Sequence, residues 1–229
     1  MASHSSPNIT TNGLVFYMDP ANTLCYPETG ITYSSLVSLS NSTISGSTSH
    51  NTITKSFDTN VTTITNDTII LSPSITFLDA SEYTLDFWVK LRNGATSANS
   101  LCGNGGTNGW IPLFITSTSN WYTTFRDTPT GAYNDFTTIT DVDLKNWTNI
   151  VMVFKSSRTI DLYINSTFRQ SVTAVNTLLT ISRIASGYSS TPNYYALQGS
   201  ISATKFYNRA LSATEVERNF LSLKSRFGL

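Results

Sequence analysis

The segment 82–91, EYTLDFWVKL, alternates apolar and other residues with a period of two. Its odd-numbered positions, from Tyr83 to Leu91, are all apolar, whereas Asp86 and Lys90 are among its even-numbered positions. Successive side chains of an extended chain point to opposite faces, so this alternation is typical of a β-strand with one buried face. The segment therefore predicts a half-buried strand.

Other runs of strand-forming residues are separated by residues that favour turns. They lie at 13–18, 68–78, 111–116, 121–125, 146–156, 158–173 and 197–209. We predict a hairpin that joins 111–116 to 121–125 across the sequence STSN, and a second hairpin in which Asn165 is the turn residue that tolerates a positive φ. Strands spaced by about 8–12 residues with turns between them predict an all-β sandwich or barrel.

The C-terminal sequence FYNRALSATEVERNFLSLKSRFGL carries the clearest helix signal in the chain. Ser212, followed three residues later by Glu215, forms a capping-box pattern, and Val216, Phe220 and Leu223 line one face of the predicted helix. A helix with such a narrow apolar stripe has to pack against another element. We expect this helix, at about 212–224, to close one open end of the sandwich.

Length and composition favour one domain of this type. The chain has 229 residues, a length that all-β sandwiches reach without division. We expect a domain at 13–229 after a polar N-terminal arm at 1–12. Thr and Ser make up roughly 30% of the residues, and they suit strands and turns respectively. The two cysteines, Cys25 and Cys102, are consistent with one disulfide or with two free core thiols.

The charge balance and the apolar runs exclude several classes of partner. The 14 acidic and 14 basic side chains give a formal net charge of zero, which offers no electrostatic basis for binding nucleic acid or an anionic membrane surface. No apolar run approaches the roughly 18 residues of a membrane span. The sequence MASHSSPNITTNG at the N-terminus lacks the basic and apolar regions of a secretory signal, so we expect no export signal and no membrane span.

Four stretches occur in a characteristic order: NGLVFYMDPANTLCYPETG, YTLDFWVKL, NWTNIVMVFKSSRTIDLYINSTFRQSV and GSISATKFYNRALSATEVERNF. Together they resemble the laminin-G-like branch of the concanavalin-A-like jelly rolls, in the variant found in structural proteins of tailed phages, especially phages of aquatic bacteria. The four stretches are similar to its opening strand and Tyr-Pro-x-x-Gly turn, its Phe-Trp core strand, its hairpin pair, and its final strand with a Leu-Ser-x-x-Glu helix. The resemblance covers nearly the whole chain.

The chain departs from this family pattern in two loops. The sequence SSLVSLSN replaces Asp-Leu-Ser-Gly after the first turn, and SFDTNVTT stands where the family usually has a Phe-Asp-Gly loop. Both loops lie near the rims of the sandwich, where family members vary. The resemblance nevertheless implies an all-β, two-sheet antiparallel jelly-roll sandwich with a short C-terminal helix.

Carboxylates and nucleophiles do not match a hydrolase. The hydrolases of this superfamily use Glu-x-Asp-x-x-Glu, which is absent here. Asp141 and Asp143 are two residues apart, but their side chains are short and a surface turn explains them better. The chain has no Gly-x-Ser-x-Gly sequence, and its two histidines, His4 and His50, lie in polar segments. We therefore expect a protein that is not an enzyme.

Calcium is a cofactor that the sequence leaves open. Many laminin-G-like and lectin-like sandwiches hold calcium at a loop rim with Asp, Asn and backbone oxygens. The ion takes six to eight oxygen ligands, carboxylates among them. Asp127, Asp135, Asp141 and Asp143 are the candidate ligands in this chain.

Aromatic residues in turn-rich segments are the candidates for sugar binding. Such residues on a rigid sandwich can form a binding rim, or they can pack on the sandwich edge or against a neighbouring subunit. The candidate carbohydrate-binding residues are Tyr188, Tyr194, Tyr195, Trp110, Trp121 and Tyr133. Trp88 and Trp147, in contrast, are interpreted as structural.

The resemblance implies a non-enzymatic virion structural protein, assembled in the host cytoplasm as a capsid decoration or fibre-type subunit. Its expected partners are other virion proteins of the capsid or tail and a host-surface glycan, and we expect a homo-oligomer. The alternative is a carbohydrate-binding or adhesion module of a secreted cellular protein. A degenerate glycan hydrolase is disfavoured by the missing carboxylates.

Overall fold

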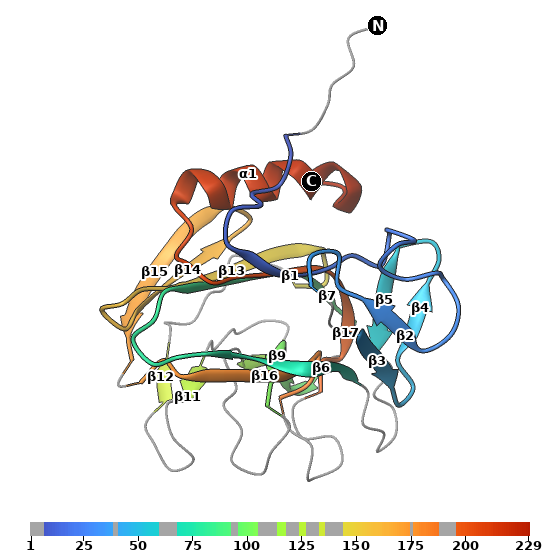
Figure 1. The fold of residues 1–229 in the computed structure, drawn as a ribbon, viewed down its shortest axis with the longest axis horizontal. Helices are drawn as coiled ribbons and strands as arrows, with labels where there is room; N and C mark the ends of the chain where they lie inside the picture. Colours follow the sequence, from blue (N-terminus) through green and yellow to red (C-terminus); the bar gives the residue numbers. More distant parts are fainter. Residues whose placement is uncertain are drawn as a thin grey trace, which may run out of the picture.

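A computed structural model describes residues 7–38, 41–59, 68–92, 96–104, 114–117, 124–126, 133–135, 144–174, 176–187 and 196–229. Two antiparallel sheets face each other across a hydrophobic core, and one helix lies above the larger sheet (Figure 1). The predicted all-β sandwich with a C-terminal helix is therefore confirmed. No helix in the described part of the chain has the length and apolar character that crossing a membrane requires.

The larger sheet has eight strands, and β7 lies near its centre. The order across the sheet is β15 (Thr167–Thr173), β14 (Thr159–Ile164), β13 (Thr148–Phe154), β7 (Tyr83–Leu91), β17 (Gly199–Tyr207), β5 (Ser56–Thr59) and β4 (Ser49–Asn51), and β1 (Leu14–Met18) also pairs with β17. All of these pairings are antiparallel.

The second sheet has five strands and lies on the opposite side of the core. Its order is β2 (Thr32–Ser34), β3 (Asn41–Ser45), β6 (Thr68–Phe77), β16 (Leu179–Ile184) and β9 (Cys102–Gly103). Two separate strand pairs complete the described strands: β8 (Thr96–Ser100) with β10 (Phe114–Ser117), and β11 (Thr124–Arg126) with β12 (Tyr133–Asp135).

The core between the sheets is built from the inward positions of their strands. Tyr83 stacks between Phe77 of the smaller sheet and Phe154 of the larger one, with ring centroids 4.4 and 4.0 Å away. At the other side of the core, Phe16 stacks on Phe206 at 5.0 Å. Aromatic contacts of this kind add to the free energy gained by burying their area, so they help to fix how the sheets pack.

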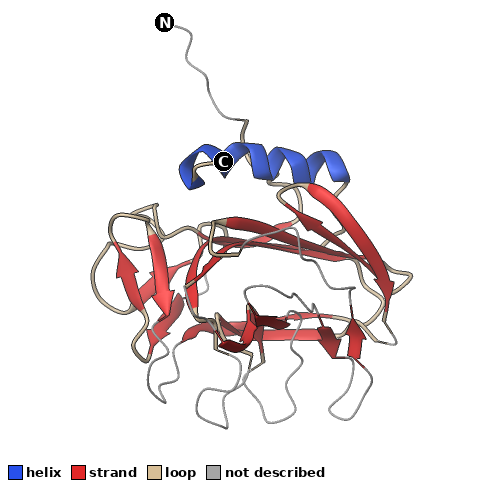
Figure 2. Ribbon diagram, turned by 180° about the vertical axis from the view of Figure 1, so that it is seen from behind, coloured by secondary structure: helices blue, strands red, loops and turns tan. Residues whose placement is uncertain are grey.

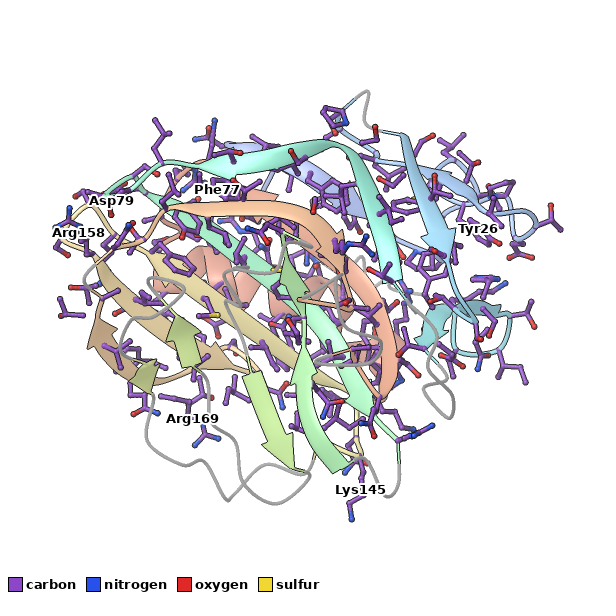
Figure 3. The ribbon with its side chains drawn as sticks, turned by 90° about the horizontal axis from the view of Figure 1, so that it is seen from below. Tyr26, Phe77, Asp79, Lys145, Arg158 and Arg169 are labelled. Carbon is purple, nitrogen blue, oxygen red and sulfur yellow. The ribbon has the colours of Figure 1, made fainter. Side chains whose placement is uncertain are left out.

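An ion pair joins the loops at one end of the sandwich. Arg158 donates to both carboxylate oxygens of Asp79, at 3.0 and 2.6 Å, and the two side chains meet in Figure 3. The backbone N–H of Thr177 also donates to Asp79, at 2.8 Å. The Arg158 guanidinium and the Thr177 amide hold the pKa of the Asp79 carboxyl well below its usual range.

Strand β7 differs from its sequence-based prediction, because both of its faces are buried. Trp88, on the face opposite the core, has no exposed surface. It stacks on Phe227 at 4.1 Å and on Phe220 at 5.7 Å between ring centroids. The alternation in the sequence identified the strand correctly, but it could not show that a helix covers the second face.

That helix is α1 (Ala213–Leu223), and it continues as a 3₁₀ turn at Lys224–Phe227. The sequence predicts that this helix closes an open end of the sandwich, and this prediction is wrong. The helix lies across the outer face of the eight-stranded sheet (Figure 2). The reason is that the apolar stripe of the helix matches Trp88 and its neighbours on that face.

The capping box predicted at the start of the helix is confirmed. The backbone N–H of Glu215 donates to Ser212 Oγ at 3.3 Å, and the N–H of Ser212 donates to the Glu215 carboxylate at 2.9 Å. Arg209 binds the same carboxylate through two hydrogen bonds of 2.9 and 2.6 Å. The Arg209 bonds, with the Ser212 bonds, lower the pKa of Glu215 to about 2.

A buried polar network lies between the helix and the sheet. Lys205 Nζ donates to Asp86 at 2.8 Å, and both side chains are fully buried. Asn149 of β13 donates to the other carboxylate oxygen at 2.8 Å, and Asn219 of α1 donates to Asp86 at 3.3 Å. Because charges in the interior need partners, this network ties three strands to the helix.

The N-terminal segment reaches the same network. The backbone N–H of Thr10 donates to Asn219 Oδ1 at 2.8 Å, and Tyr207 Oη donates to the Thr10 carbonyl at 3.0 Å. Thr10 is buried. These two bonds fix the chain near Thr10 against the helix and β17.

One local prediction about a turn and the state of the two cysteines can be compared with the structure. Asn165 adopts a φ of 49° in the turn between β14 and β15, as predicted. The hairpin predicted across 117–120 stays a prediction, because residues 118–123 lie outside the described residues. Among the described strands, β10 pairs with β8 and β11 pairs with β12. Cys25 and Cys102 are both buried and free.

We expect the substitution Lys205→Met to lower the free energy of unfolding by about 3–5 kcal/mol, because it leaves the Asp86 carboxylate buried without its cation. The double variant Asp86→Leu with Lys205→Met is expected to recover most of this loss, since no charge then remains inside. Denaturant unfolding measures both values.

The control is Lys55→Met, which breaks a more exposed pair with Glu28 and should lower the free energy of unfolding far less, because solvent screens the charges of an exposed pair. A double variant that is no more stable than Lys205→Met would contradict the role assigned to the buried pair.

Candidate functional site

The aromatic residues predicted to bind sugar cannot be compared with the structure. Tyr188, Tyr194, Tyr195, Trp110 and Trp121 lie outside the described residues. Tyr133 is the first residue of β12, of which only the backbone is described. Their role in sugar binding stays a prediction.

The candidate calcium ligands have the same status. Asp127, Asp141 and Asp143 lie outside the described residues, and Asp135 is placed only by its backbone, opposite Thr124 in the β11–β12 pair. Within the residues that the structure describes, no group of three or more His, Cys, Asp or Glu side chains is arranged to hold a metal. Calcium binding stays a prediction.

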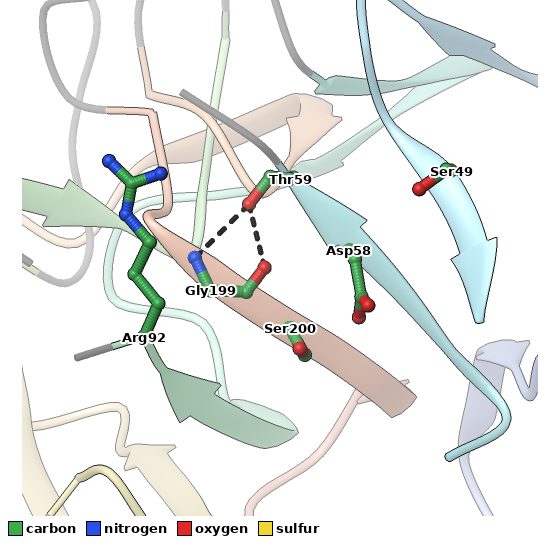
Figure 4. Close-up of a pocket in the computed structure, with 6 residues that line it drawn as sticks. All are labelled: Ser49, Asp58, Thr59, Arg92, Gly199 and Ser200. Atoms are coloured by element: carbon green, nitrogen blue, oxygen red, sulfur yellow. Dashed lines mark hydrogen bonds between the residues drawn. The ribbon is translucent and has the colours of Figure 1, made fainter. Parts of the chain in front are cut away.

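The structure instead shows a polar pocket at one end of the larger sheet. It has a volume of about 280 Å³ and is drawn in Figure 4. The residues that line it come from β4, β5, β17 and the position directly after β7: Ser49, Asp58, Thr59, Gly199, Ser200 and Arg92. Hydroxyl, carboxylate and guanidinium groups are the groups that orient a polar ligand.

Strand register brings these distant residues together. Asp58 lies directly opposite Ser49 on one side and Ser200 on the other. Ser200 in turn lies opposite Lys90 of β7. Residues that face each other across strands have Cβ atoms about 5 Å apart, so the four side chains form one row on the outer face of the sheet.

Asp58 is held by its own hairpin. Asn51 Nδ2 donates to one carboxylate oxygen at 2.8 Å, and Ser56 Oγ donates to the other at 2.9 Å. Both partners belong to the β4–β5 hairpin. The carboxylate therefore has a fixed orientation, with two of its acceptor positions already used.

Thr59 and Gly199 join β5 to β17 at the floor of the pocket. Thr59 Oγ1 donates to the carbonyls of Leu197 and Gly199, the latter at 2.9 Å. A Cβ atom at Gly199 would lie 2.1 Å from the Lys90 carbonyl oxygen and 2.8 Å from Leu91 Cα. Only glycine allows β17 and β7 to approach this closely.

The β4–β5 hairpin is also anchored to the C-terminal segment. Arg226 donates to Asp19 Oδ1 at 2.6 Å, to the Lys55 carbonyl at 2.9 Å and to Ser202 Oγ at 2.7 Å. One guanidinium thus joins the 3₁₀ turn, the loop after β1, the hairpin turn and β17. This fixes the hairpin that carries Ser49 and Asp58.

Sequence patterns do not identify these pocket residues as a site. Asp58 lies in SFDTNVTT, one of the two loops where the chain departs from the family pattern, and this departure was the only sequence signal near the pocket. Ser49, Arg92 and Ser200 lie in separate segments, which only the pairing register brings together. Local patterns contain no information about that register.

Comparison with known families identifies the domain. The family model Laminin_G_3, described as the concanavalin A-like lectin/glucanases superfamily, matches residues 58–217, well over half of the chain. The chain belongs to the concanavalin A-like lectin/glucanases superfamily. No curated protein matches the sequence.

Solved structures share the fold of this superfamily member at low sequence identity. A Trypanosoma rangeli sialidase in complex with sialic acid superposes with a TM-score of 0.67 at 14% identity, over 98% of this chain and 36% of the sialidase. The binding domain of Paraclostridial Mosquitocidal Protein 1 gives 0.63 at 19% identity, over 91% of this chain and 52% of that domain.

The Botulinum Neurotoxin Type G receptor binding domain is also similar, with a TM-score of 0.61 at 14% identity, over 92% of this chain and 51% of that domain. The chain thus spans between about a third and a half of the length of these structures. At such identities the likeness shows the fold of the superfamily, and function has to be argued from the site.

We expect Gly199→Ala to lower the free energy of unfolding by at least about 2 kcal/mol, because its methyl group would overlap the β7 backbone. The matched control is Gly30→Ala, where an added Cβ meets no atom within 4 Å and only the φ of +83° opposes the change. We expect this control to lower the free energy of unfolding by about 1–2 kcal/mol. Urea unfolding of both variants gives the comparison. A Gly199→Ala protein as stable as the parent would contradict the close approach of β17 and β7.

Proposed function

We propose that this chain is a non-enzymatic carbohydrate-binding domain, and that glycan binds in the pocket between Asp58 and Arg92. The observation that carries the proposal is the pocket itself: hydroxyl, carboxylate and guanidinium groups line a hollow of about 280 Å³. Carboxylates accept hydrogen bonds from sugar hydroxyls, and a guanidinium donates them. All of these groups except that of Arg92 stand on paired strands, which hold them more firmly than loops do.

The proteins that share the fold are consistent with a binding role. Two of the similar structures are named as a binding domain and a receptor binding domain, and a third is a sialidase in complex with sialic acid. Membership of a superfamily described as lectins and glucanases supports a glycan as the ligand.

The described carboxylates support the non-enzymatic part of the proposal. A general acid in glycoside hydrolysis needs a carboxyl group with a raised pKa. In this chain, ion pairs lower the pKa values of Glu28, Asp79 and Glu215. Asp86 is paired with Lys205 below the helix, where no substrate reaches. These groups serve to stabilise the fold.

The setting of the domain is part of the same proposal. The four sequence stretches that resemble tailed-phage structural proteins support a place on a virion, as a capsid decoration or fibre-type subunit that helps adsorption to host glycans. A module of a larger secreted cellular protein is the second candidate. It is favoured by the fact that the similar structures are two to three times longer than the part that matches.

The test of glycan binding is an array of bacterial and animal glycans, probed with the purified protein in calcium and again in chelator, followed by calorimetry of the best ligand. We expect Asp58→Asn and Arg92→Ala each to weaken binding by roughly 10-fold, the effect of losing one hydrogen bond to a charged group. Glu217→Gln and Arg218→Ala, on the exposed face of α1, are the matched controls and should bind as the parent does.

A further variant, Tyr194→Ala with Tyr195→Ala, separates the pocket from the loop site that the sequence predicts. Binding that depends on the tyrosines and not on Asp58 or Arg92 would place the site outside the pocket. Loss of binding in chelator alone would make calcium part of the site. A protein that binds no glycan under either condition would contradict the proposal.

The setting is tested by immuno-electron microscopy with antibodies to the purified domain. We expect the antibodies to label the capsid or the tail of phage particles at regular positions, when the particles are produced by the bacterium that carries the gene. Labelling of the bacterial surface or the culture fluid, with bare particles, would contradict a virion location and favour the secreted module.

A further inference from the structure

We infer that the ligand is an oligosaccharide that lies across the strands of the larger sheet, with one sugar in the pocket and a neighbouring sugar stacked on Trp147. This inference rests on the proposed glycan binding, and it adds the direction of the ligand, its length class and a second subsite. The surface that carries it is a strip of outward-facing residues: Ser49, Asp58, Ser200, Lys90 and Trp147.

Strand register extends the row of polar residues beyond the pocket. Lys90 lies opposite Ser200, and Val89 lies opposite Thr148, the first residue of β13. The residue before Thr148 is Trp147, which an antiparallel ladder brings level with Lys90. Neighbouring strands are about 4.8 Å apart, so Trp147 lies roughly 10 Å from Ser200 across the sheet. Lys90 and Trp147 are outside the pocket itself but adjoin it along this row.

The strip is narrow because the C-terminal segment covers the sheet beside it (Figure 2). The residues two positions further along β17, β7 and β13 are all buried: Ser202, Trp88 and Asn149. Arg226 donates to Ser202 Oγ at 2.7 Å, and Phe227 stacks on Trp88 at 4.1 Å. The residues of the strip itself, in contrast, keep part of their surface accessible.

This covering gives the ligand a direction. From the pocket, a chain of sugars cannot run along the strands towards the helix, because the 3₁₀ turn with Arg226 and Phe227 stands in its way. It can run across the strands, from β17 over Lys90 of β7 to Trp147. The strip therefore continues the pocket as a path along the edge of the covered area.

Trp147 supplies a contact that the pocket lacks. None of the six residues that line the pocket is aromatic, so binding there depends on hydrogen bonds. Phe227 packs on Trp147 with 4.9 Å between ring centroids, and the indole ring nevertheless stays partly accessible. The C–H groups of a sugar can pack on such a ring, while nearby polar groups fix its orientation. Because Phe227 already holds the ring, a ligand does not have to order it.

The distance decides the length of the ligand. About 10 Å between Ser200 and Trp147 is longer than one sugar ring, so the sugar in the pocket cannot also cover the indole. A neighbouring sugar of the same chain makes that contact. Lys90 lies between the two subsites, where its ammonium can donate to the hydroxyls of the connecting part of the ligand.

The experiment is calorimetry with probes of increasing length. The probes are maltotriose, cellotriose and galactotriose with their disaccharides and methyl glycosides, and the same length series of the glycan that binds most tightly on the array. We expect affinity to rise by about 5- to 10-fold from the methyl glycoside to the trisaccharide, because the longer ligand reaches the indole. The indole fluorescence should change with the longer probes and not with the methyl glycoside.

The variant Trp147→Ala should abolish the gain in affinity with length, while the methyl glycoside binds as it does to the parent. Trp147→Phe keeps a ring on Phe227, so we expect it to keep part of the gain and to lose the fluorescence change. The matched control is Phe168→Ala, which removes a half-exposed aromatic side chain from β15, away from the strip. Thermal unfolding confirms that each variant is folded.

The outcomes separate the strip from the pocket. A gain with length that is lost in Trp147→Ala and kept in Phe168→Ala supports the inference. A methyl glycoside that binds the parent as tightly as the trisaccharide, or a gain that is unchanged in Trp147→Ala, overturns the second subsite but keeps the pocket. Binding that needs Trp147 and is unchanged in Asp58→Asn and Arg92→Ala overturns the pocket. Absence of binding to these probes and to every glycan on the array overturns both.

Discussion

The buried pair of Asp86 and Lys205 is the interaction on which the rest of the fold depends. The two residues face each other directly across β7 and β17 and have no exposed surface. Two charges removed from water are tolerated only when all their partners are in place. Those partners, Asn149 of β13 and Asn219 of α1, are not correctly placed until the sheet is in register and the helix has docked. The correct strand register and the docking of the helix therefore depend on each other, because the buried pair needs both.

The same register builds the pocket. A shift of β17 by one residue would turn Lys205 towards the apolar core and Ser200 away from Asp58, because side chains alternate with a period of two. The β7–β17 pairing has an irregularity between Ile201 and Thr204. Beyond it, Ser200 lies opposite Lys90 and Gly199 lies opposite Leu91. The charges that hold the helix thus also position polar groups at the far end of the same two strands.

Local features of the fold could be predicted from the sequence, and non-local ones could not. Ser212 with Glu215, and Asn165 in its turn, act within a few residues, so their patterns were read correctly. The second buried face of β7 was missed because Trp88 and Asp86 are covered by a segment more than a hundred residues away. The pocket was missed for the same reason, since its residues come from three strands and from the position after a fourth. The aromatic and aspartate candidates lie in segments outside the described residues, where they stay predictions.

The proposed binding site stands largely on strands, and this has a consequence for how its affinity would arise. The carboxylate of Asp58 and the backbone at Gly199 are already fixed by hydrogen bonds and by the β5–β17 pairing, so a ligand does not have to order them. Arg226 also binds the hairpin that carries Ser49 and Asp58 to the C-terminal 3₁₀ turn. The next residue of that turn, Phe227, packs on Trp88. The pocket and the docked helix therefore share one continuous set of contacts, and the position of the hairpin depends on the helix that covers the sheet.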